Sequence, residues 1–445
     1  MNYQDCLAYL AALGHELRGV KFDLVNMRHI AAALCHPERK YPSVIVAGTN
    51  GKGSTSAMLA SILECSGYRT GLYTSPHLVK VNERIRVDGA EIADEDFAGA
   101  FSEVEATASG LMADGTLAAH PSFFEFLTAA AFVHFAHRNI DIAVLEVGMG
   151  GRLDATNIVE PEVAVITNVE LDHTEFLGST HAEIAAEKAG VIRAGKPVIS
   201  GCTHPDAIEV IRQRGASLGA ELFELPGLAR VANLHPEGGL YNFDLALNGT
   251  RFAHLRSALR GRFQVNNASA AVAAAWKLGE RGWKIPDAAI SEGIARTNWP
   301  GRLEACGKLP LTLLDGAHNP AAACALAGYL RTGLAGRPLA LVYASMRDKA
   351  IEEIADLLFP CAAQIYLTQT TQPRAATPEE ILSRVRARLP GSEIIIEPDP
   401  MRALAAARGA VPADGVVLAA GSLFLVGAIK QALESKVSGG LPIRD

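Results

Sequence analysis

The 445-residue sequence predicts an α/β protein with two parts: an N-terminal domain of the P-loop type, with a parallel sheet plus a small antiparallel sheet, and a Rossmann-like α/β C-terminal domain. Three observations support this. An apolar strand, a glycine-rich turn and a helix follow one another over residues 43–63. Strand and helix patterns then alternate to about residue 201, and a second alternating series begins after residue 303. Such alternation is typical of mainly parallel sheets covered by helices on both faces.

The glycine-rich turn, residues 48–54, is the strongest local signal. It reads Gly-Thr-Asn-Gly-Lys-Gly-Ser, follows the apolar run 43–47 and precedes a predicted helix over 55–66. Such a turn directs backbone N–H groups and a helix N-terminus at one point, which suits a phosphate chain. Val46 stands where the general P-loop pattern has glycine, and Gly53 separates the lysine from the hydroxyl. An ordinary strand-to-helix turn is the alternative, but three glycines, a lysine and a hydroxyl favour a P-loop ATPase domain.

The rest of the N-terminal part continues the α/β pattern and then changes. Residues 240–247 alternate between apolar and polar, and the following Asn248-Gly249 predicts a hairpin, hence a small antiparallel sheet. An alanine-rich helix is predicted after it. The elements predicted here are strands at 142–147, 163–167 and 197–200 and helices at 123–137, 181–191 and 266–278.

The pattern breaks near residues 297–302, where we place the domain boundary. The predicted division is an ATP-binding domain over 1–297, a linker over 298–303 and a C-terminal domain over 304–445. No G-x-G-x-x-G turn follows the first strand of the second series, so a dinucleotide is not expected there. Its strands are predicted at 311–314, 339–344, 364–367, 393–396 and 416–420.

Composition excludes several classes of protein. The chain is 49% hydrophobic and 20% charged, which fits a soluble globular protein. A net charge of −7 argues against a general nucleic-acid or membrane surface. The first residues lack a signal-peptide pattern, and the most apolar segment, 415–429, is too short to span a bilayer. Seven cysteines without a C-x-x-C pair indicate reduced thiols in a cytoplasmic protein.

A phosphate site needs a cation, and the strand ends offer ligands for Mg²⁺. Glu146 ends a buried strand just before a glycine run, His173 follows the strand at 163–167, and Ser75 follows a short strand at 71–73. The alternatives are a water-exposed glutamate, a structural histidine and a turn serine. Lys188, judged by spacing alone, is a surface helix lysine.

The second domain repeats this placement. Asp315 and His318 follow its first strand, and Ser422 follows its last strand. Polar residues at the carboxyl ends of strands favour a binding crevice, here in the cleft between the domains. A loop stabilised by an Asx turn is the alternative.

Taken together, the strings resemble the Mur ligase superfamily, and within it the folylpolyglutamate and dihydrofolate synthases. The resemblance runs from about residue 43 to 430. The strings that carry it are Gly48-Thr-Asn-Gly-Lys-Gly-Ser54, Thr74-Ser-Pro-His-Leu78, Glu146-Val-Gly-Met-Gly-Gly-Arg-Leu-Asp-Ala-Thr-Asn157, Leu171-Asp-His-Thr174, Glu187-Lys-Ala-Gly190, Pro300-Gly-Arg302 and Asp315-Gly-Ala-His-Asn-Pro320.

The resemblance implies a role for each matching residue. It implies that Lys188 is carbamylated and helps a second Mg²⁺, in place of the surface position that spacing favours. Phe123 and Phe124 could stack on a pterin, although a helix-core role is equally compatible with one of them. The resemblance implies that ATP phosphates are bound by Gly51, Lys52, Gly53 and Ser54, and that the rest of the nucleotide is contacted by Asn267, Arg302 and Asp315. It implies that Mg²⁺ is bound by Ser75, Glu146 and His173, and that glutamate is bound near His318 and Ser422. The pterin substrate would be held by Ser122, Phe123, Phe124, Arg152 and Asp154. Of these, we expect Lys52, Lys188 and His318 to act in catalysis.

The implied activity is ATP-dependent addition of L-glutamate to dihydropteroate, to folates or to both, through an acyl phosphate. We expect a cytoplasmic monomer that acts on small molecules, with no nucleic-acid or membrane partner. A peptidoglycan-precursor Mur ligase is one alternative, disfavoured because only 47 residues precede Gly48. A nucleotide-dependent switch or binding protein is another, and a second α/β domain argues against it.

Overall fold

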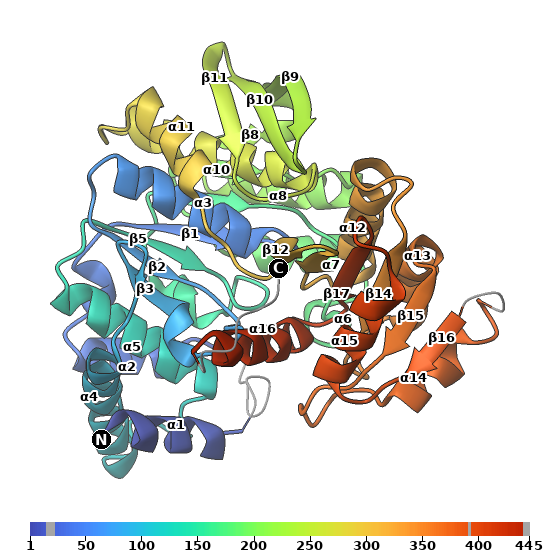
Figure 1. Ribbon diagram of the computed structural model, residues 1–445. Coiled ribbons are helices and arrows are strands. Elements are labelled where there is room, and N and C mark those ends of the chain that lie inside the picture. Colours follow the sequence, from blue (N-terminus) through green and yellow to red (C-terminus); the bar gives the residue numbers. More distant parts are fainter. Residues whose placement is uncertain (15–22, 390–392, 439–445) are drawn as a thin grey trace.

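The computed structural model describes residues 1–14, 23–389 and 393–438. Its strands form three sheets (Figure 1). We call the first two sheets and their helices the N-terminal lobe, and the third sheet with its helices the C-terminal lobe. All strands of the N-terminal lobe precede residue 258, and the third sheet begins at Glu304. The predicted linker falls between the end of α11 at Arg296 and that strand, although the domain limits themselves stay a prediction.

The first sheet has eight strands in the order β4-β3-β2-β5-β1-β6-β7-β8. Its six strands from β2 to β8 run parallel, and β3 and β4 add an antiparallel edge. The predicted parallel sheet is confirmed. The strand bounds are β1 Ser43–Ala47, β2 Thr70–Tyr73, β3 Ile85–Val87, β4 Ala90–Glu91, β5 Ile142–Glu146, β6 Val163–Ile166, β7 Val198–Ser200 and β8 Leu222–Glu224.

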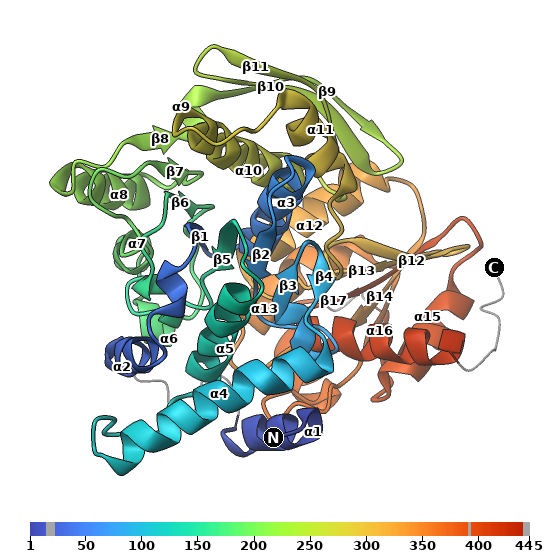
Figure 2. The ribbon, with the colours of Figure 1, turned by 90° about the vertical axis from the view of Figure 1, so that its left-hand side faces the viewer.

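Helices cover both faces of this sheet because its strands are apolar on both sides. In β1, Val44 and Val46 pack toward α3, α10 and α11, whereas Ile45 and Ala47 pack toward α5 and the helices around it. Figure 2 shows α1, α4 and α5 together on this second side. The helices of the lobe are α1 Tyr3–Ala12, α2 Val25–Ala33, α3 Lys52–Cys65, α4 Asp94–Ala113, α5 Phe123–His137, α6 Thr174–Leu177, α7 His181–Ala189, α8 Pro205–Ser217, α9 Leu225–Leu228, α10 Phe263–Glu280 and α11 Asp287–Arg296, with short 3₁₀ turns at Pro37–Arg39, Val81–Arg84 and Ala155–Ile158.

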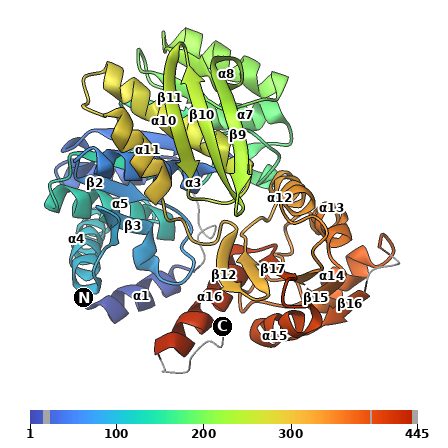
Figure 3. The same ribbon diagram turned by 45° about the horizontal axis from the view of Figure 1, so that its top comes forward.

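The small antiparallel sheet has the order β11-β10-β9 and lies beside α10 and α11 (Figure 3). Strand β10, Leu240–Leu247, turns into β11, Thr250–Ser257, through Asn248 and Gly249, whose φ angles are 47° and 89°. Two positive φ angles are what a two-residue hairpin requires, so the predicted hairpin is confirmed. Strand β9, Ala229–Glu237, was not predicted.

The C-terminal lobe has a six-stranded sheet in the order β12-β13-β17-β14-β15-β16. Its last five strands in this order are parallel and match the five predicted ones, while β12 pairs antiparallel with β13 and was not predicted. The Rossmann-like α/β prediction is confirmed. The bounds are β12 Glu304–Lys308, β13 Leu311–Leu314, β14 Leu339–Tyr343, β15 Gln364–Leu367, β16 Glu393–Ile396 and β17 Val416–Ala420, with α12 Pro320–Gly333, α13 Ile351–Leu358, a 3₁₀ turn at Phe359–Cys361, α14 Pro378–Val385, α15 Pro400–Ala410 and α16 Leu423–Ser438.

Within the described residues, no helix combines the length and apolar character needed to cross a bilayer.

Candidate active site

A cavity of about 1320 Å³ lies between the lobes, at the carboxyl ends of their parallel strands. Every site residue predicted from the sequence lines it, and both lobes contribute. The lining therefore includes Gly51, Lys52, Gly53, Ser54, Ser75, Ser122, Phe123, Phe124, Glu146, Arg152, Asp154, His173, Lys188, Asn267, Arg302, Asp315, His318 and Ser422.

The glycine-rich turn is held open toward this cavity. Gly51, with φ 83°, precedes α3, which begins at Lys52 rather than at the predicted residue 55. The side chain of Asn168 accepts the backbone N–H groups of Thr49 and Asn50 at 3.2 and 2.9 Å. These bonds fix the turn. The first N–H groups of a helix have no intrahelical partners, and the first residues of α3 line the cavity, as a phosphate site requires.

Lys52 lies at the centre of this turn. Its Nζ donates to the carbonyls of Gly48 and Thr49, at 3.1 Å each. Burial lowers its pKa, and the nearby carboxylate of Glu146 opposes that shift. The charge of Glu146 therefore partly compensates that of Lys52.

Glu146 ends β5 beside Val46 of β1, and its residue is only 4% exposed. Its Oε2 accepts the backbone N–H of Ser75 at 3.2 Å. Burial raises the pKa of Glu146, and Lys52 counters part of that rise. The water-exposed alternative for Glu146 is thus wrong, since an unpaired carboxylate would be costly at such a position.

His173 follows β6 in a left-handed conformation, with φ 50°. Burial lowers its pKa to about 4. At neutral pH the imidazole is therefore uncharged, which is the form that binds metals.

The donors around Glu146 suit a cation that keeps several ligands from elsewhere. Over the part of the chain that the structure describes, no three side chains of His, Cys, Asp or Glu converge as a metal cage. Mg²⁺ characteristically takes one or two carboxylates and completes its shell with water and substrate phosphates. Ser75, Glu146 and His173 beside the P-loop fit that requirement.

Lys188 is buried, not exposed. It comes from α7, is 3% exposed, and its Nζ donates to the carbonyl of Gly48 at 3.0 Å. Burial, together with the positive charge of Lys52, lowers the pKa of Lys188 to about 7. The surface reading that spacing alone favours is wrong.

The residues predicted for the pterin substrate lie on the N-terminal side of the cavity. The Arg84 guanidinium lies 5.4 Å from the centre of the Phe123 ring. Phe124 packs so tightly on Gly148 that a Cβ there would lie 2.6 Å from the ring. Both rings remain on the cavity wall, so each is positioned to contact a flat ligand.

Three polar members of this group hold their surroundings in place. Ser122 caps α5 through reciprocal bonds with Glu125. Asp154 accepts the N–H groups of Met149 and Thr156, both at 3.0 Å. These contacts fix the start of α5 and the glycine-rich loop after β5.

Arg152 pairs with Glu187 at 2.7 Å. Since Glu187 immediately precedes Lys188 in α7, this pair ties the loop after β5 to the helix that carries the buried lysine.

The nucleotide contacts implied by the resemblance surround the P-loop from the other side. Asn267 in α10 approaches so closely that a Cβ on Gly51 would lie 2.3 Å from its Oδ1. Asp315 accepts the N–H groups of Leu303 and Ala317, both at 2.9 Å. Burial raises the pKa of Asp315, and Arg302 counters that rise. Asp315 therefore fixes the backbone next to Arg302.

The two residues linked to glutamate, His318 and Ser422, lie at strand ends of the C-terminal lobe. Burial lowers the pKa of His318 to about 4, and its Nδ1 lies 2.7 Å from the carbonyl of Gly316. The Ser422 hydroxyl accepts the N–H of Phe424 in the first turn of α16, at 3.1 Å.

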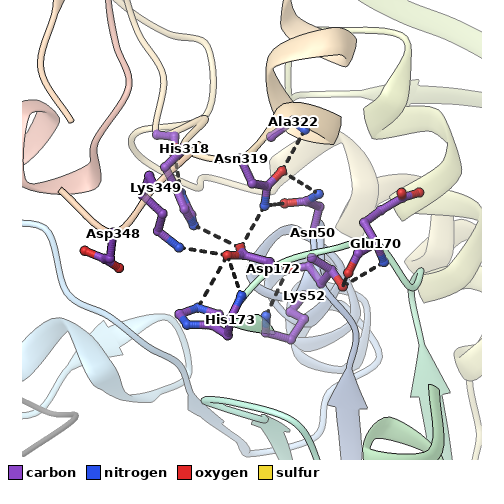
Figure 4. Close-up of polar contacts among 12 residues, drawn as sticks. Asn50, Lys52, Glu170, Asp172, His173, His318, Asn319, Ala322, Asp348 and Lys349 are labelled. Carbon is purple, nitrogen blue, oxygen red and sulfur yellow. Dashed lines mark hydrogen bonds and ion pairs between the residues drawn. The ribbon is translucent and has the colours of Figure 1, made fainter. Parts of the chain in front are cut away.

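Asp172 was not predicted, yet it lies at the centre of the contact between the lobes (Figure 4). Its carboxylate accepts from Lys349 Nζ at 2.8 Å and from Asn319 Nδ2 at 2.9 Å. Burial alone would raise its pKa, but His173, His318 and Lys349 together lower it well below its ordinary value. The sequence shows that Asp172 follows a strand and precedes His173. It does not show that Asn319 and Lys349, 147 and 177 residues away, are its partners.

Comparison with known proteins agrees with this geometry. Residues 46–275 match the Mur ligase middle domain, and residues 301–423 match the glutamate ligase domain of Mur ligases. The chain is 33% identical to the dihydrofolate synthase/folylpolyglutamate synthase of Bacillus subtilis, over 97% of this chain and 99% of that one. It is 34% identical to the folylpolyglutamate synthase of Lacticaseibacillus casei over the same shares. This chain belongs to the folylpolyglutamate and dihydrofolate synthases of the Mur ligase superfamily.

Solved structures of this family have the same fold. The Mycobacterium tuberculosis folylpolyglutamate synthase complexed with ADP superposes with a TM-score of 0.91 at 30% identity, covering 97% of this chain and 98% of that one. E. coli FolC in complex with DHPP and ADP gives a TM-score of 0.85 at 30% identity over the same shares. The family and the two-lobed α/β fold predicted from the sequence are confirmed.

Proposed function

We propose that this synthase-family chain is an ATP-dependent ligase that joins L-glutamate to both dihydropteroate and folates through an acyl phosphate. One observation carries the proposal. A single cavity of about 1320 Å³ brings the P-loop, the Glu146–Ser75 pair and buried Lys188 together with His318 of the other lobe. It is large enough for a nucleotide and a second substrate side by side.

The first step activates a carboxylate, which is otherwise a poor electrophile. A substrate carboxylate oxygen attacks the γ-phosphorus, the bond to the departing ADP oxygen breaks, and an acyl phosphate forms. Lys52 and Arg302 would place positive charge beside the phosphates, and the N-terminus of α3 would orient them. One Mg²⁺ ion, when bound near Ser75, Glu146 and His173, and a second one near Lys188 would neutralise phosphate charge.

We also propose that Lys188 is carbamylated. Its depressed pKa leaves a large share of neutral amine near pH 7, and only the neutral amine attacks CO₂. The N–C bond forms and one proton leaves to solvent, which converts a buried cation into an anion. Lys52, close enough to depress that pKa by its charge, would stabilise the anion.

The second step needs the other lobe. The glutamate amine, placed near His318 and Ser422, attacks the acyl carbon. The C–N bond forms, the C–O bond to phosphate breaks, phosphate leaves with the bonding electrons, and the amine proton passes to solvent. Water must be excluded because it would hydrolyse the acyl phosphate. We propose that closure about the linker at residues 298–303 achieves this.

The chain would act as a cytoplasmic monomer. Size-exclusion chromatography with light scattering would check the monomeric state.

The test is a four-component assay. Purified protein with ATP, Mg²⁺, L-glutamate and either dihydropteroate or tetrahydrofolate should release ADP and form a glutamyl product only when all components are present. The two pterin substrates assayed in parallel decide whether one or both are used. ATP turnover that ignores every pterin would instead favour a nucleotide-dependent switch.

A further inference from the structure

Asp172 receives hydrogen bonds mainly from the opposite lobe. Lys349 Nζ lies 2.8 Å from Oδ1, and Asn319 Nδ2 lies 2.9 Å from Oδ2. His318 Nε2 lies 3.7 Å from Oδ2. From its own lobe, Asp172 accepts the backbone N–H of His173 at 2.9 Å, and the ring of His173 is 3.9 Å away. Three side chains of the C-terminal lobe thus gather on one carboxylate of the N-terminal lobe (Figure 4).

Asn319 extends this contact to the P-loop. It exchanges two amide hydrogen bonds with Asn50, at 2.9 and 3.2 Å. Its Oδ1 also accepts the N–H of Ala322 at 2.9 Å and so caps α12. The two N–H groups of the Asn319 amide go to Asn50 and Asp172, so one side chain joins the P-loop, the loop after β6 and the start of α12.

This arrangement depends on the lobes being together. The Asp172 side chain is 9% exposed and that of Lys349 is 12% exposed. If the lobes part, Asp172 loses the donors from Lys349 and Asn319 and keeps its backbone bond to His173. Opening would exchange the ion pair and these hydrogen bonds for contacts with water, so their net stabilisation favours the closed arrangement.

We propose that Asp172 is a positioning residue that holds the C-terminal lobe closed over the P-loop, so that the acyl phosphate meets the glutamate amine before water. It acts through Lys349 and Asn319, which join it to the C-terminal lobe and to Asn50. The inference rests on the proposed ligase function and adds to it the device that couples ATP use to ligation.

The test compares Asp172→Asn and Lys349→Met with wild type. The wild-type enzyme should release one phosphate per glutamyl product. Each variant should release a several-fold excess of phosphate and show a larger rise in KM for glutamate than for ATP. The double variant should be no more uncoupled than either single one, because both remove the same contact. Asp356→Asn is the matched control, since Asp356 pairs with Arg388 within one lobe and should stay fully coupled.

Three results would overturn the inference: a ratio of phosphate to product that stays at one in Asp172→Asn, strictly additive effects in the double variant, or a shift in Mg²⁺ half-saturation as the sole change. The last result would assign Asp172 to the metal site. X-ray scattering with a non-hydrolysable ATP analogue gives a readout independent of turnover, in which both variants should have a larger radius of gyration. A wild-type protein that makes no glutamyl product would refute the proposed function. The scattering measurement would still show whether the Asp172 contact holds the lobes together.

Discussion

The indole of Trp299 lies directly against Gly53 in the first turn of α3. A Cβ built on Gly53 would meet Cζ2 and Nε1 of that ring at 2.9 Å. Trp299 belongs to the segment that joins the lobes, and the Arg86 guanidinium lies 5.5 Å from the centre of its ring. The glycine that departs from the general P-loop pattern is therefore the position at which the inter-lobe segment packs onto the nucleotide loop.

Replacing Gly53 by alanine should therefore disturb the P-loop. The added methyl forces the Trp299 indole to shift, at a cost of about 1–3 kcal/mol for such overpacking, and should raise KM for ATP. Thermal unfolding and ATP titration measure the two effects. Gly99→Ala in α4, where nothing lies within 4 Å, is the control and should not destabilise the protein. A second change, Trp299→Leu, should restore part of the ATP affinity; if it does not, the indole contact is not the cause.

Lys188→Ala should abolish most turnover, because the neutral methyl group cannot replace a carbamate. Removing one group that stabilises charge in an active site costs about 10²–10³-fold in kcat. Formate or acetate should restore part of the rate in Lys188→Ala but not in Lys188→Arg. Full activity in Lys188→Ala would contradict the carbamate role.

The pKa of Lys188, near 7, also predicts how the enzyme recovers from decarboxylation. Below pH 7 the amine is increasingly protonated and cannot attack CO₂. After a brief acid treatment, activity should return faster at pH 8 than at pH 6 when both solutions are held at the same concentration of dissolved CO₂. Equal recovery rates at both pH values would argue against a carbamate.

Glu146→Gln should separate stability from activity. Burial raises the pKa of this carboxyl, so its ionised form destabilises the fold as pH rises through that pKa. The variant should therefore be at least as stable as the ligand-free wild type at pH 7.5, yet need more Mg²⁺ and turn over far more slowly. Denaturant unfolding and Mg²⁺ titration of turnover check this. Unchanged Mg²⁺ dependence would remove Glu146 from the metal site.

Stability should fall as pH drops from about 6.5 toward 4. His173 and His318 have pKa values lowered to about 4, against an ordinary value near 6.5. Between these values the unfolded chain binds protons that the folded chain does not, so lower pH favours unfolding. His318→Gln should flatten this slope in urea unfolding, by at most about 1.4 kcal/mol per pH unit. The exposed His137→Gln is the comparison variant, and a slope equally changed by both would refute the assignment to His318.

Local sequence patterns determined most of the strands, turns and strand-end site residues of this protein. Alternating apolar runs fix the strands, because a strand buried on both faces must be apolar along its length. Glycine at 51 and Asn248-Gly249 mark turns because positive φ is cheap there. Such signals lie within a few residues of one another, so they placed the P-loop, the hairpin and the strand-end residues Glu146 and His173. The sequence did not predict strands β9 and β12, because their alternation of apolar and polar residues is weak.

Tertiary structure decided what distant residues do to each other. Lys188 reads as a surface lysine in its own helix, and packing of α7 beside Gly48 buries it and lowers its pKa. Asp172 contacts Lys349, which lies 177 residues further along the chain, and Gly53 contacts Trp299 of the inter-lobe segment. Burial and charge pairing depend on the three-dimensional distance between side chains. The spacing of two residues along the chain predicts that distance only when both lie in the same helix or strand.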